Sequence, residues 1–282
     1  MSASRLASDY CPLAGRILLS IVFFNSGLEK IFAWGKFAAM TAAKGIPLPE
    51  VALALTIALV LAGGAMILTG WHARCAALAL FVWMIPTTLL FHNYWAFDGA
   101  AAVNQFNHFL KNVSIMGALL LIVAFGPGRF SAGVRTATHA RVVSRNDYVA
   151  AAGRTMLALL FLVSGYKKVI DFAATAAYMA SRGMPLVELF AVASIVLELG
   201  GGLMLVAGWK ARWSAAALFV LFMIPATLIF HRFWAVDAAQ VFNQTNHFLK
   251  NVAIMGGLAL VAGFGPGMLS ADRATPRQPG GA

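Results

Sequence analysis

Residues 92–128 read HNYWAFDGAAAVNQFNHFLKNVSIMGALLLIVAFGPG, and residues 231–267 read HRFWAVDAAQVFNQTNHFLKNVAIMGGLALVAGFGPG. About 23 of 37 positions are identical when the two stretches are laid over each other without a gap. Matches on this scale mark an internal duplication, which decides how the rest of the chain is interpreted.

The polar residues of the duplicated stretch return almost unchanged, whereas its apolar residues drift. Four of the six histidines of the chain belong to this set. The first copy has His92, Trp95, Asp98, Asn104, Gln105, Asn107, His108, Lys111 and Asn112, and the second has His231, Trp234, Asp237, Asn243, Gln244, Asn246, His247, Lys250 and Asn251. The pattern indicates that both copies share one structural or functional task.

The composition is that of an integral membrane protein. The chain is 61% hydrophobic and only 11% charged, outside the usual range of soluble domains. Its net charge of +11 is spread without a dense basic run, so the sequence does not indicate a nucleic-acid partner. The lipid bilayer is the expected surrounding, and the basic residues are expected to mark cytoplasmic loops.

Eight segments are long and apolar enough to cross a bilayer, which takes about 20 residues per helix. They lie at about 13–34, 50–70, 74–95, 104–125, 151–172, 187–208, 212–234 and 243–264. The repeat unit therefore holds four helices, and an even number makes the two units parallel. The predicted fold is an all-α integral membrane protein with eight transmembrane helices, arranged as two parallel four-helix bundle repeats.

The expected organisation has four parts. Residues 1–128 form the first repeat, 129–148 a basic cytoplasmic linker, 149–268 the second repeat, and 269–282 a disordered tail. The distribution of Lys and Arg predicts a multi-pass protein of the bacterial inner membrane with both termini cytoplasmic and the histidine-rich hairpins at the outer surface. One residue is inserted in the seventh helix before Pro225, which aligns with Pro86.

The fourth helix carries its polar residues on one face, because positions 104, 105, 108, 111 and 112 recur at helical spacing. A lysine at Lys111 is costly facing lipid, so this face should meet a protein interior or a wet cavity. His92 and His108 flank a short loop and can approach each other. Asp98 in that loop can orient a ring or stabilise its charged form.

Three interpretations of these residues stay open. They can tie the hairpin by hydrogen bonds, bind a small redox molecule such as a quinone headgroup, or ligate a metal or haem. Two histidines and one aspartate per half are a thin ligand set for zinc, and a hairpin does not supply bis-histidine haem geometry. The candidate cofactor-binding residues are His92, Trp95, Asp98, His108, Lys111, Asn112, Trp234, Asp237, Lys250 and Asn251. Trp95 and Trp234 also fit an interfacial aromatic belt.

Glu198 is a second outlier, because it falls in the middle of an apolar helix where the first half has Val60. A glutamate this deep in a membrane is paired or protonated, and Lys168 or Lys250 is the expected partner. If the carboxyl handles protons near a redox site, the second half is the active one. Glu198, His231 and His247 are then the candidate catalytic residues.

Taken together, the motifs resemble the DoxX family of four-helix bacterial membrane proteins. They are S-G-x-x-K at Ser26–Lys30 and Ser164–Lys168, G-x-P at Gly45–Pro47 and Gly183–Pro185, Glu198 before glycines, F-H-x-x-W, H-x-x-K-N and a closing G-P-G. The resemblance covers nearly the whole chain as a tandem pair and implies a four-helix bundle per half. Relatives include membrane subunits of thiosulfate:quinone oxidoreductase, so the resemblance also implies redox work.

The leading hypothesis is a membrane subunit of a redox process that binds a quinone near the outer surface and partners another redox subunit. As an enzyme, it would be a subunit of a quinone-linked oxidoreductase. Two other classes of function stay open. The absence of a soluble domain or clear cofactor motif suits a non-catalytic scaffold or assembly partner. Parallel repeats with polar residues inside the membrane also suit a small-solute transporter.

Overall fold

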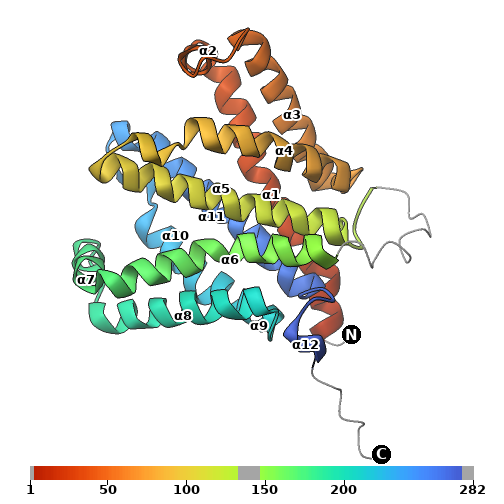
Figure 1. The fold of residues 1–282 in the computed structure, drawn as a ribbon, viewed down its shortest axis with the longest axis vertical. Coiled ribbons are helices and arrows are strands. Elements are labelled where there is room, and N and C mark those ends of the chain that lie inside the picture. The colour runs from red at the N-terminus through yellow and green to blue at the C-terminus, as the bar shows by residue number, and fades with distance from the viewer. Residues whose placement is uncertain (1–2, 133–146, 275–282) are drawn as a thin grey trace, which may run out of the picture.

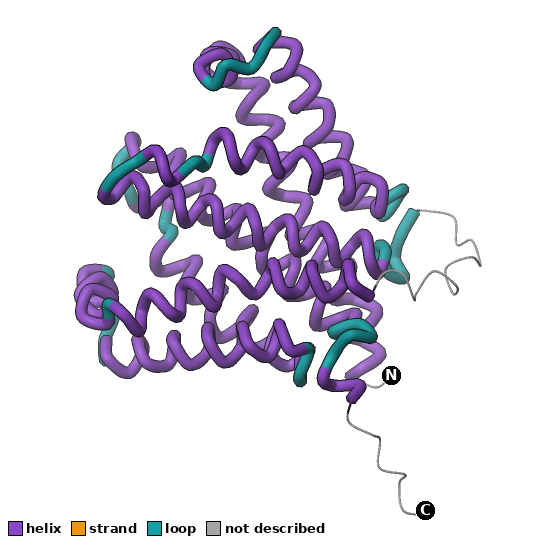
Figure 2. The backbone as a smooth tube through the Cα atoms, in the orientation of Figure 1, coloured by secondary structure: helices purple, strands orange, loops and turns teal. Residues whose placement is uncertain are grey.

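The computed structural model describes residues 3–132 and 147–274, and every regular element in these residues is a helix (Figure 2). Eight helices are long and apolar enough to cross a membrane. They span Arg5–Phe32, Pro49–Thr69, Ala73–Ala96, Gly99–Phe125, Asp147–Ile170, Val187–Ala207, Ala211–Ala235 and Ala238–Phe264. The predicted all-α membrane fold is confirmed, and each span lies close to its predicted position.

The first repeat contains five α-helices and the second contains their counterparts (Figure 1). In the first these are α1 (Ala3–Phe32), α2 (Trp34–Ala43), α3 (Pro49–Thr69), α4 (Ala73–Phe91) and α5 (Gly99–Phe125). In the second they are α6 (Asp147–Ile170), α7 (Phe172–Ser181), α8 (Val187–Ala207), α9 (Ala211–Ala217) continuing into α10 (Ile224–Phe230), and α11 (Ala238–Phe264). The hairpins α4–α5 and α10–α11 are joined by short 3₁₀ turns at Tyr94–Ala96 and Phe233–Ala235.

The short helices α2 and α7 were not predicted from the sequence, because ten residues are too few to register as a span. Each is followed by a turn in which a glycine adopts a positive φ, 70° at Gly45 and 74° at Gly183. A side chain rarely tolerates that backbone region, so glycine is required for the reversal into the next long helix.

The extra residue of the seventh span is accommodated as a π-helical turn at Leu218–Met223, between α9 and α10. A one-residue insertion in an α-helix is commonly absorbed in this way, because the wider turn takes up the added residue without breaking the helix. The residues beyond it therefore keep the register of their counterparts, and His231 ends α10 as His92 ends α4.

The two repeats are packed across each other. The first helix of each repeat lies against the last helix of the other, α1 along α11 and α6 along α5, and α5 also contacts α11 (Figure 1). Glycines permit this close approach: a Cβ on Gly256 would lie 2.6 Å from the carbonyl oxygen of Gly15, and one on Gly117 would lie 2.5 Å from that of Gly153. The repeats therefore share one core.

Four arginines that recur between the repeats bind helix ends. Arg16 is fully buried and donates to carbonyls at the C-terminal end of α3, as Arg154 does to a carbonyl of α8. Arg74 and Arg212 donate to carbonyls in the last turns of α5 and α11. The last carbonyls of a helix have no partner within the helix, so these side chains supply the missing donors.

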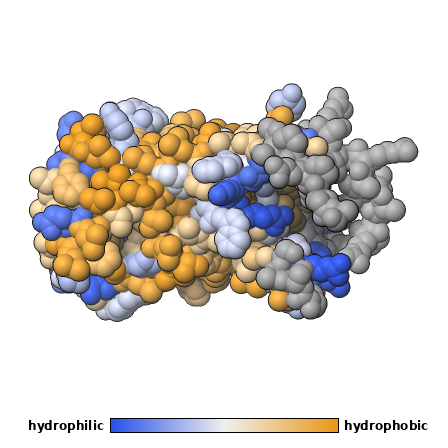
Figure 3. Space-filling view, turned by 90° about the horizontal axis from the view of Figure 1, so that it is seen from below, coloured by the Kyte–Doolittle hydropathy of each residue, from blue (hydrophilic) through white to orange (hydrophobic). Residues whose placement is uncertain are grey.

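The outside of the molecule is that of a membrane protein. Leu189, Val196 and Leu203 on α8 are 62%, 64% and 61% exposed, which is costly in water and favourable in lipid. Figure 3 shows apolar residues over most of the middle of one face, with hydrophilic residues gathered toward its ends. The start of α1 and the short helix α12 (Ala271–Ala274) lie at the same end of the bundle (Figure 1). The chain is a multi-pass membrane protein.

Two predicted segments differ from the structure or fall outside it. Most of the expected linker, 133–146, lies outside the described residues, as does 275–282. Within the expected disordered tail, residues 271–274 form α12 instead, and the carboxylate of Asp272 accepts a hydrogen bond from the backbone N–H of Lys210 at 2.6 Å. That bond anchors the start of the tail to the turn between α8 and α9.

Candidate functional site

The polar faces of α5 and α11 meet inside the molecule. His108, Lys111, His247 and Lys250 are only 5–8% exposed, as the cost of placing a lysine in lipid requires. His92 and His231 approach them from the ends of α4 and α10. We call these six residues the histidine–lysine cluster: His92, His108, Lys111, His231, His247 and Lys250.

The four imidazole rings form one continuous stack that runs across both repeats. Ring centroids are 5.0 Å apart for His92 and His108, 4.0 Å for His108 and His247, and 4.9 Å for His247 and His231. The two histidines of each hairpin are neighbours, as predicted, and the two hairpins are neighbours of each other. The result is one cluster shared by both halves.

Each lysine binds the histidines of the opposite repeat. Lys111 Nζ lies 3.2 Å from Nε2 of His231 and 3.1 Å from Nδ1 of His247. Lys250 Nζ lies 3.1 Å from Nε2 of His92 and 3.2 Å from Nδ1 of His108. Because a lysine can only donate, these four ring nitrogens are acceptors.

Side-chain amides accept from the other ring nitrogens and so fix the tautomers. Nδ1 of His92 lies 2.9 Å from Oε1 of Gln105, and Nε2 of His108 lies 2.9 Å from Oδ1 of Asn243. The second repeat mirrors this, with His231 on Gln244 and His247 on Asn104. All eight ring nitrogens are therefore engaged, with the proton positions assigned from the network itself.

The aspartates are not among the hydrogen-bond partners of the rings in the described residues, although Asp98 was expected to orient a ring or stabilise its charged form. Asp98 and Asp237 are the residues that precede α5 and α11, and neither side chain is hydrogen-bonded to an imidazole in the described chain. Gln105, one helical turn from His108, holds the ring of His92 instead. The Asn-Gln pair recurs in both copies of the sequence, but the repeat alone does not show that these side chains bind the rings.

The remaining predicted binding residues lie beside the cluster. Asn112 and Asn251 donate to the hydroxyl oxygens of Thr88 and Thr227 at 3.0 Å, which ties α5 to α4 and α11 to α10. Trp95 and Trp234 are 59% and 56% exposed and pack edge-on against neighbouring aromatic rings. Their exposure fits the aromatic-belt interpretation rather than a ligand contact.

The described residues contain no group of three or more His, Cys, Asp or Glu side chains placed to hold a metal ion. The imidazole nitrogens point to lysines and amides, and neighbouring rings stack instead of facing one another across a gap. The residues present in this part of the chain do not supply the ligand geometry that the metal or haem interpretation needs.

Glu198 is paired with a lysine that is not part of the cluster. Its carboxylate accepts a hydrogen bond from Lys168 on α6, one of the two partners predicted for it. The Glu198 side chain is 1% exposed and that of Lys168 is 19% exposed. No hydrogen bond joins Glu198 to His231 or His247 in the described residues, whereas His231 and His247 stack on each other.

A cavity of about 450 Å³ reaches the cluster from the first repeat. We call it the first-half pocket. Side chains from α1 to α5 and from α11 line it, with apolar walls and one polar end. Its polar lining includes Ser26, Glu29, Lys30, His92, Asn104, Gln105, His108, Asn112, Asn243, Asn246 and Lys250. The sequence had favoured the second half.

The two cluster lysines differ in one respect. Lys111 also donates to the carbonyl oxygen of His247 at 3.3 Å, so all three of its N–H groups have acceptors. Lys250 has two acceptors, His92 and His108, and no third within the described residues. Because Lys250 lines the first-half pocket, its third N–H is available to a bound molecule.

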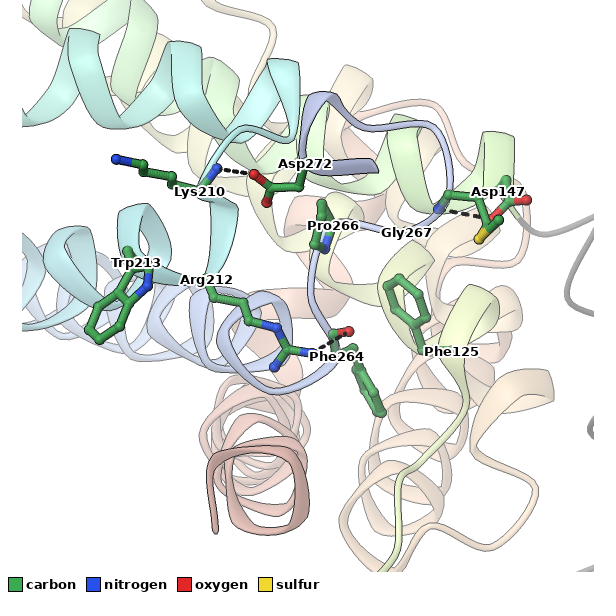
Figure 4. A pocket seen from close by; sticks show the side chains of 10 residues that line it. Phe125, Asp147, Lys210, Arg212, Trp213, Phe264, Pro266, Gly267 and Asp272 are labelled. Atoms are coloured by element: carbon green, nitrogen blue, oxygen red, sulfur yellow. Dashed lines mark hydrogen bonds between the residues drawn. The ribbon is translucent and has the colours of Figure 1, made fainter. Parts of the chain in front are cut away.

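A larger hollow of about 540 Å³ lies at the other end of the bundle, beside α12 (Figure 4). Three of its four charged side chains are bonded to the backbone: Arg212 donates to Phe264, Asp272 accepts from Lys210, and Asp147 accepts from Met268. These bonds fasten chain segments together, so we assign this hollow a structural role and take the first-half pocket as the candidate site.

The fold and the site define a multi-pass membrane protein in which two four-helix repeats share one buried polar cluster. The model of the DoxX family matches residues 11–93 and 149–232, and the chain belongs to that family. The matched regions contain His92 and His231 but end before the α5 and α11 residues of the cluster.

Similar proteins fall into two groups. The Escherichia coli inner membrane proteins YphA and YqjF are 34% and 36% identical over 120 and 121 residues, which is 43% of this chain and 85% and 86% of theirs. The Surfeit locus protein 4 homolog of Drosophila melanogaster is 24% identical over 272 residues, 93% of this chain and 88% of that one. No solved structure matches the chain.

Proposed function

We propose that this chain is a membrane subunit of a redox process that binds a quinone headgroup in the first-half pocket. The observation that carries the proposal is the free N–H of Lys250 at the polar end of an otherwise largely apolar cavity. Ligand pockets of about 300–1,000 Å³ with apolar walls and a few polar groups suit small amphiphilic molecules.

Each part of a quinone has a counterpart in the pocket. Lys250 donates to one ring carbonyl oxygen, and the aromatic walls that include Phe23, Phe37 and Trp83 pack against the ring. Asn and Gln side chains at the same end supply further polar contacts. A bound quinone would supply electron transfer, chemistry that the side chains lining the pocket lack.

The hydrogen-bond network decides what Lys250 can do. Its ammonium is held by two imidazoles whose other nitrogens are themselves anchored, so its free N–H is fixed in direction before a ligand arrives. Donors held in this way in a dry site stabilise charge that develops on an acceptor oxygen. The pocket would therefore favour the more electron-rich form of a bound carbonyl compound.

The proposed setting is the bacterial inner membrane, with the cluster near the outer surface. The names of YphA and YqjF as inner membrane proteins support the membrane, and the excess of Lys and Arg in the N-terminal segment, the expected linker and the C-terminal tail of the sequence supports cytoplasmic termini. Reporter fusions after Phe97 and after the C-terminus test this orientation. An active periplasmic reporter at the C-terminus would reverse it.

The binding experiment uses the two cluster lysines as a matched pair. Decylubiquinone binding to the purified full chain is followed by quenching of tryptophan fluorescence, because Trp83 lines the pocket. We expect Lys250→Met to weaken binding at least about tenfold and Lys111→Met to change it less than about threefold. Equal losses in the two variants, or no binding to the unaltered chain, would refute the proposal.

A further inference from the structure

The two repeats place different residues at one equivalent position. Val60 on α3 faces Gly27 of α1, where a Cβ would lie 3.3 Å from Cγ2 of the valine. Glu198 on α8 faces Gly165 of α6, where a Cβ added to the glycine would lie 3.2 Å from the Cβ of Glu198. The same site between the first and second long helices is therefore apolar in one repeat and acidic in the other.

The lysine beside this position changes its partner accordingly. In the second repeat, Lys168 is paired with the buried carboxylate of Glu198. In the first repeat, its counterpart Lys30 donates only to Ser26, at 3.0 Å to the carbonyl and 2.6 Å to the hydroxyl oxygen. No carboxylate lies within 4 Å of Lys30 in the described residues, although Glu29 lines the same pocket.

The first-half pocket therefore has an excess of positive charge. Two lysines, Lys30 and Lys250, line it against the single carboxylate of Glu29. The histidine–lysine cluster behind Lys250 adds Lys111 and contains no carboxylate. Cations buried within a membrane are normally paired, because an unpaired charge is costly there.

We infer that the ligand of the first-half pocket carries an anionic headgroup that binds Lys30 and Lys250, because Val60 stands where the second repeat has the carboxylate that pairs with Lys168. The inference rests on the proposed pocket and narrows its ligand to an amphiphile with an acidic oxygen, such as a hydroxyquinone or a carboxylate. In the second repeat, the side chain of Glu198 supplies the carboxylate that pairs with the equivalent lysine.

The test compares two ligands that differ in one charge. A 2-hydroxy-3-alkyl-1,4-naphthoquinone is a vinylogous acid that is ionised near neutral pH, and its 2-methoxy analogue is neutral with nearly the same shape. We expect the full chain to bind the hydroxy compound at least about tenfold more tightly, since hydrogen bonds to charged groups are the stronger ones. Lys30→Met should reduce this preference to less than about threefold.

Two substitutions at Val60 separate charge from size. Val60→Glu rebuilds the second repeat's arrangement in the first and should abolish the preference for the hydroxy compound. Val60→Gln adds nearly the same volume without the charge. In this variant the logarithm of the affinity ratio between the hydroxy and methoxy compounds should stay at about half its original value or more. Both variants are checked for an unchanged elution profile and thermal stability, and position 198 shows that the fold accepts a glutamate at the equivalent place.

The outcomes distinguish the two proposals. Equal affinity for the hydroxy and methoxy compounds overturns the anionic-headgroup inference and leaves quinone binding standing. Failure of both quinones to bind overturns the proposed function. Binding of dodecanoate but not of dodecanol, lost in Lys30→Met, would then uphold the anionic site by itself, and binding of neither would overturn the inference as well.

Discussion

Replacing Asn104 by leucine tests whether the two repeats share one polar network. Oδ1 of Asn104 accepts from Nε2 of His247 at 2.9 Å, and the Asn104 and Asn243 amides bond to each other at 3.3 Å in both directions. The substitution leaves two donors unpaired, the ring N–H of His247 and the amide of Asn243. At about 1 kcal/mol each, the value suited to side-chain hydrogen bonds in membranes, the loss is about 2 kcal/mol.

Combining Asn104→Leu with Asn243→Leu measures the coupling free energy between the two residues. Asn243→Leu should also cost about 2 kcal/mol, because it leaves the ring N–H of His108 and the amide of Asn104 unpaired. In the double variant both amides are absent and only the two ring N–H groups stay unpaired, so the cost should again be about 2 kcal/mol rather than about 4 kcal/mol. This coupling of about 2 kcal/mol arises only if the two residues meet.

The assay is the free energy of unfolding in mixed micelles as the fraction of a denaturing detergent is raised, followed by circular dichroism. Asn107→Leu is the control, because Asn107 sits on the same helix with an exposed side chain. Its substitution should change the free energy by less than about 0.5 kcal/mol. Additive losses from Asn104→Leu and Asn243→Leu would refute the shared network.

Three further predictions concern the fold. Gly256→Ala should lower the free energy of unfolding by about 2 kcal/mol, because its Cβ meets a backbone oxygen, whereas Gly200→Ala has open space and should be neutral or stabilising; equal effects would contradict the helix crossing. Lys168→Met should lower the free energy of unfolding by about 3 kcal/mol, because it leaves Glu198 buried without its lysine. Adding Glu198→Leu should restore most of that free energy, measured by unfolding in mixed micelles. Deleting Leu221 from the π-helical turn should convert it to regular α-helix with the folded protein retained in size-exclusion chromatography; aggregation of that variant would show that the turn is needed.

The sequence was sufficient to predict the membrane-spanning helices and the burial of the polar face of the fourth one. Apolar length set the eight helices, and the cost of a lysine in lipid required Lys111 to face inward. The inserted residue before Pro225 was visible as a break in the repeat, and the structure gives it the form of a π-helical turn. Each of these features depends on residues close together in the chain.

The partner of each polar side chain could not be predicted in the same way. Which helix α5 faces depends on the close approach at Gly15, Gly117, Gly153 and Gly256, and small residues do not identify the helix they will meet. The expectation that Asp98 orients a ring assumed contacts within one hairpin. The helix crossing brings Gln105, Asn104 and the opposite repeat's lysine to the rings first.

The location of the pocket was also beyond the sequence. The second repeat was predicted to be the active one because Glu198 is an acid in an apolar helix. Val60, its counterpart, was interpreted as the loss of that acid from the first repeat. In the structure the acid is held by Lys168, and the pocket that reaches the cluster lies in the first repeat. A missing charge beside Lys30 is harder to notice in a sequence than an added one.

The most direct test of the account is photolabelling of the purified full chain with an azido-quinone, followed by mass spectrometry of the labelled peptides. The account predicts label on segments that line the first-half pocket, in α1, α3 and α4, with label displaced by decylubiquinone and reduced in Lys250→Met. Displaceable label on α8 or α10 of the second repeat, or label that no quinone displaces, would contradict it.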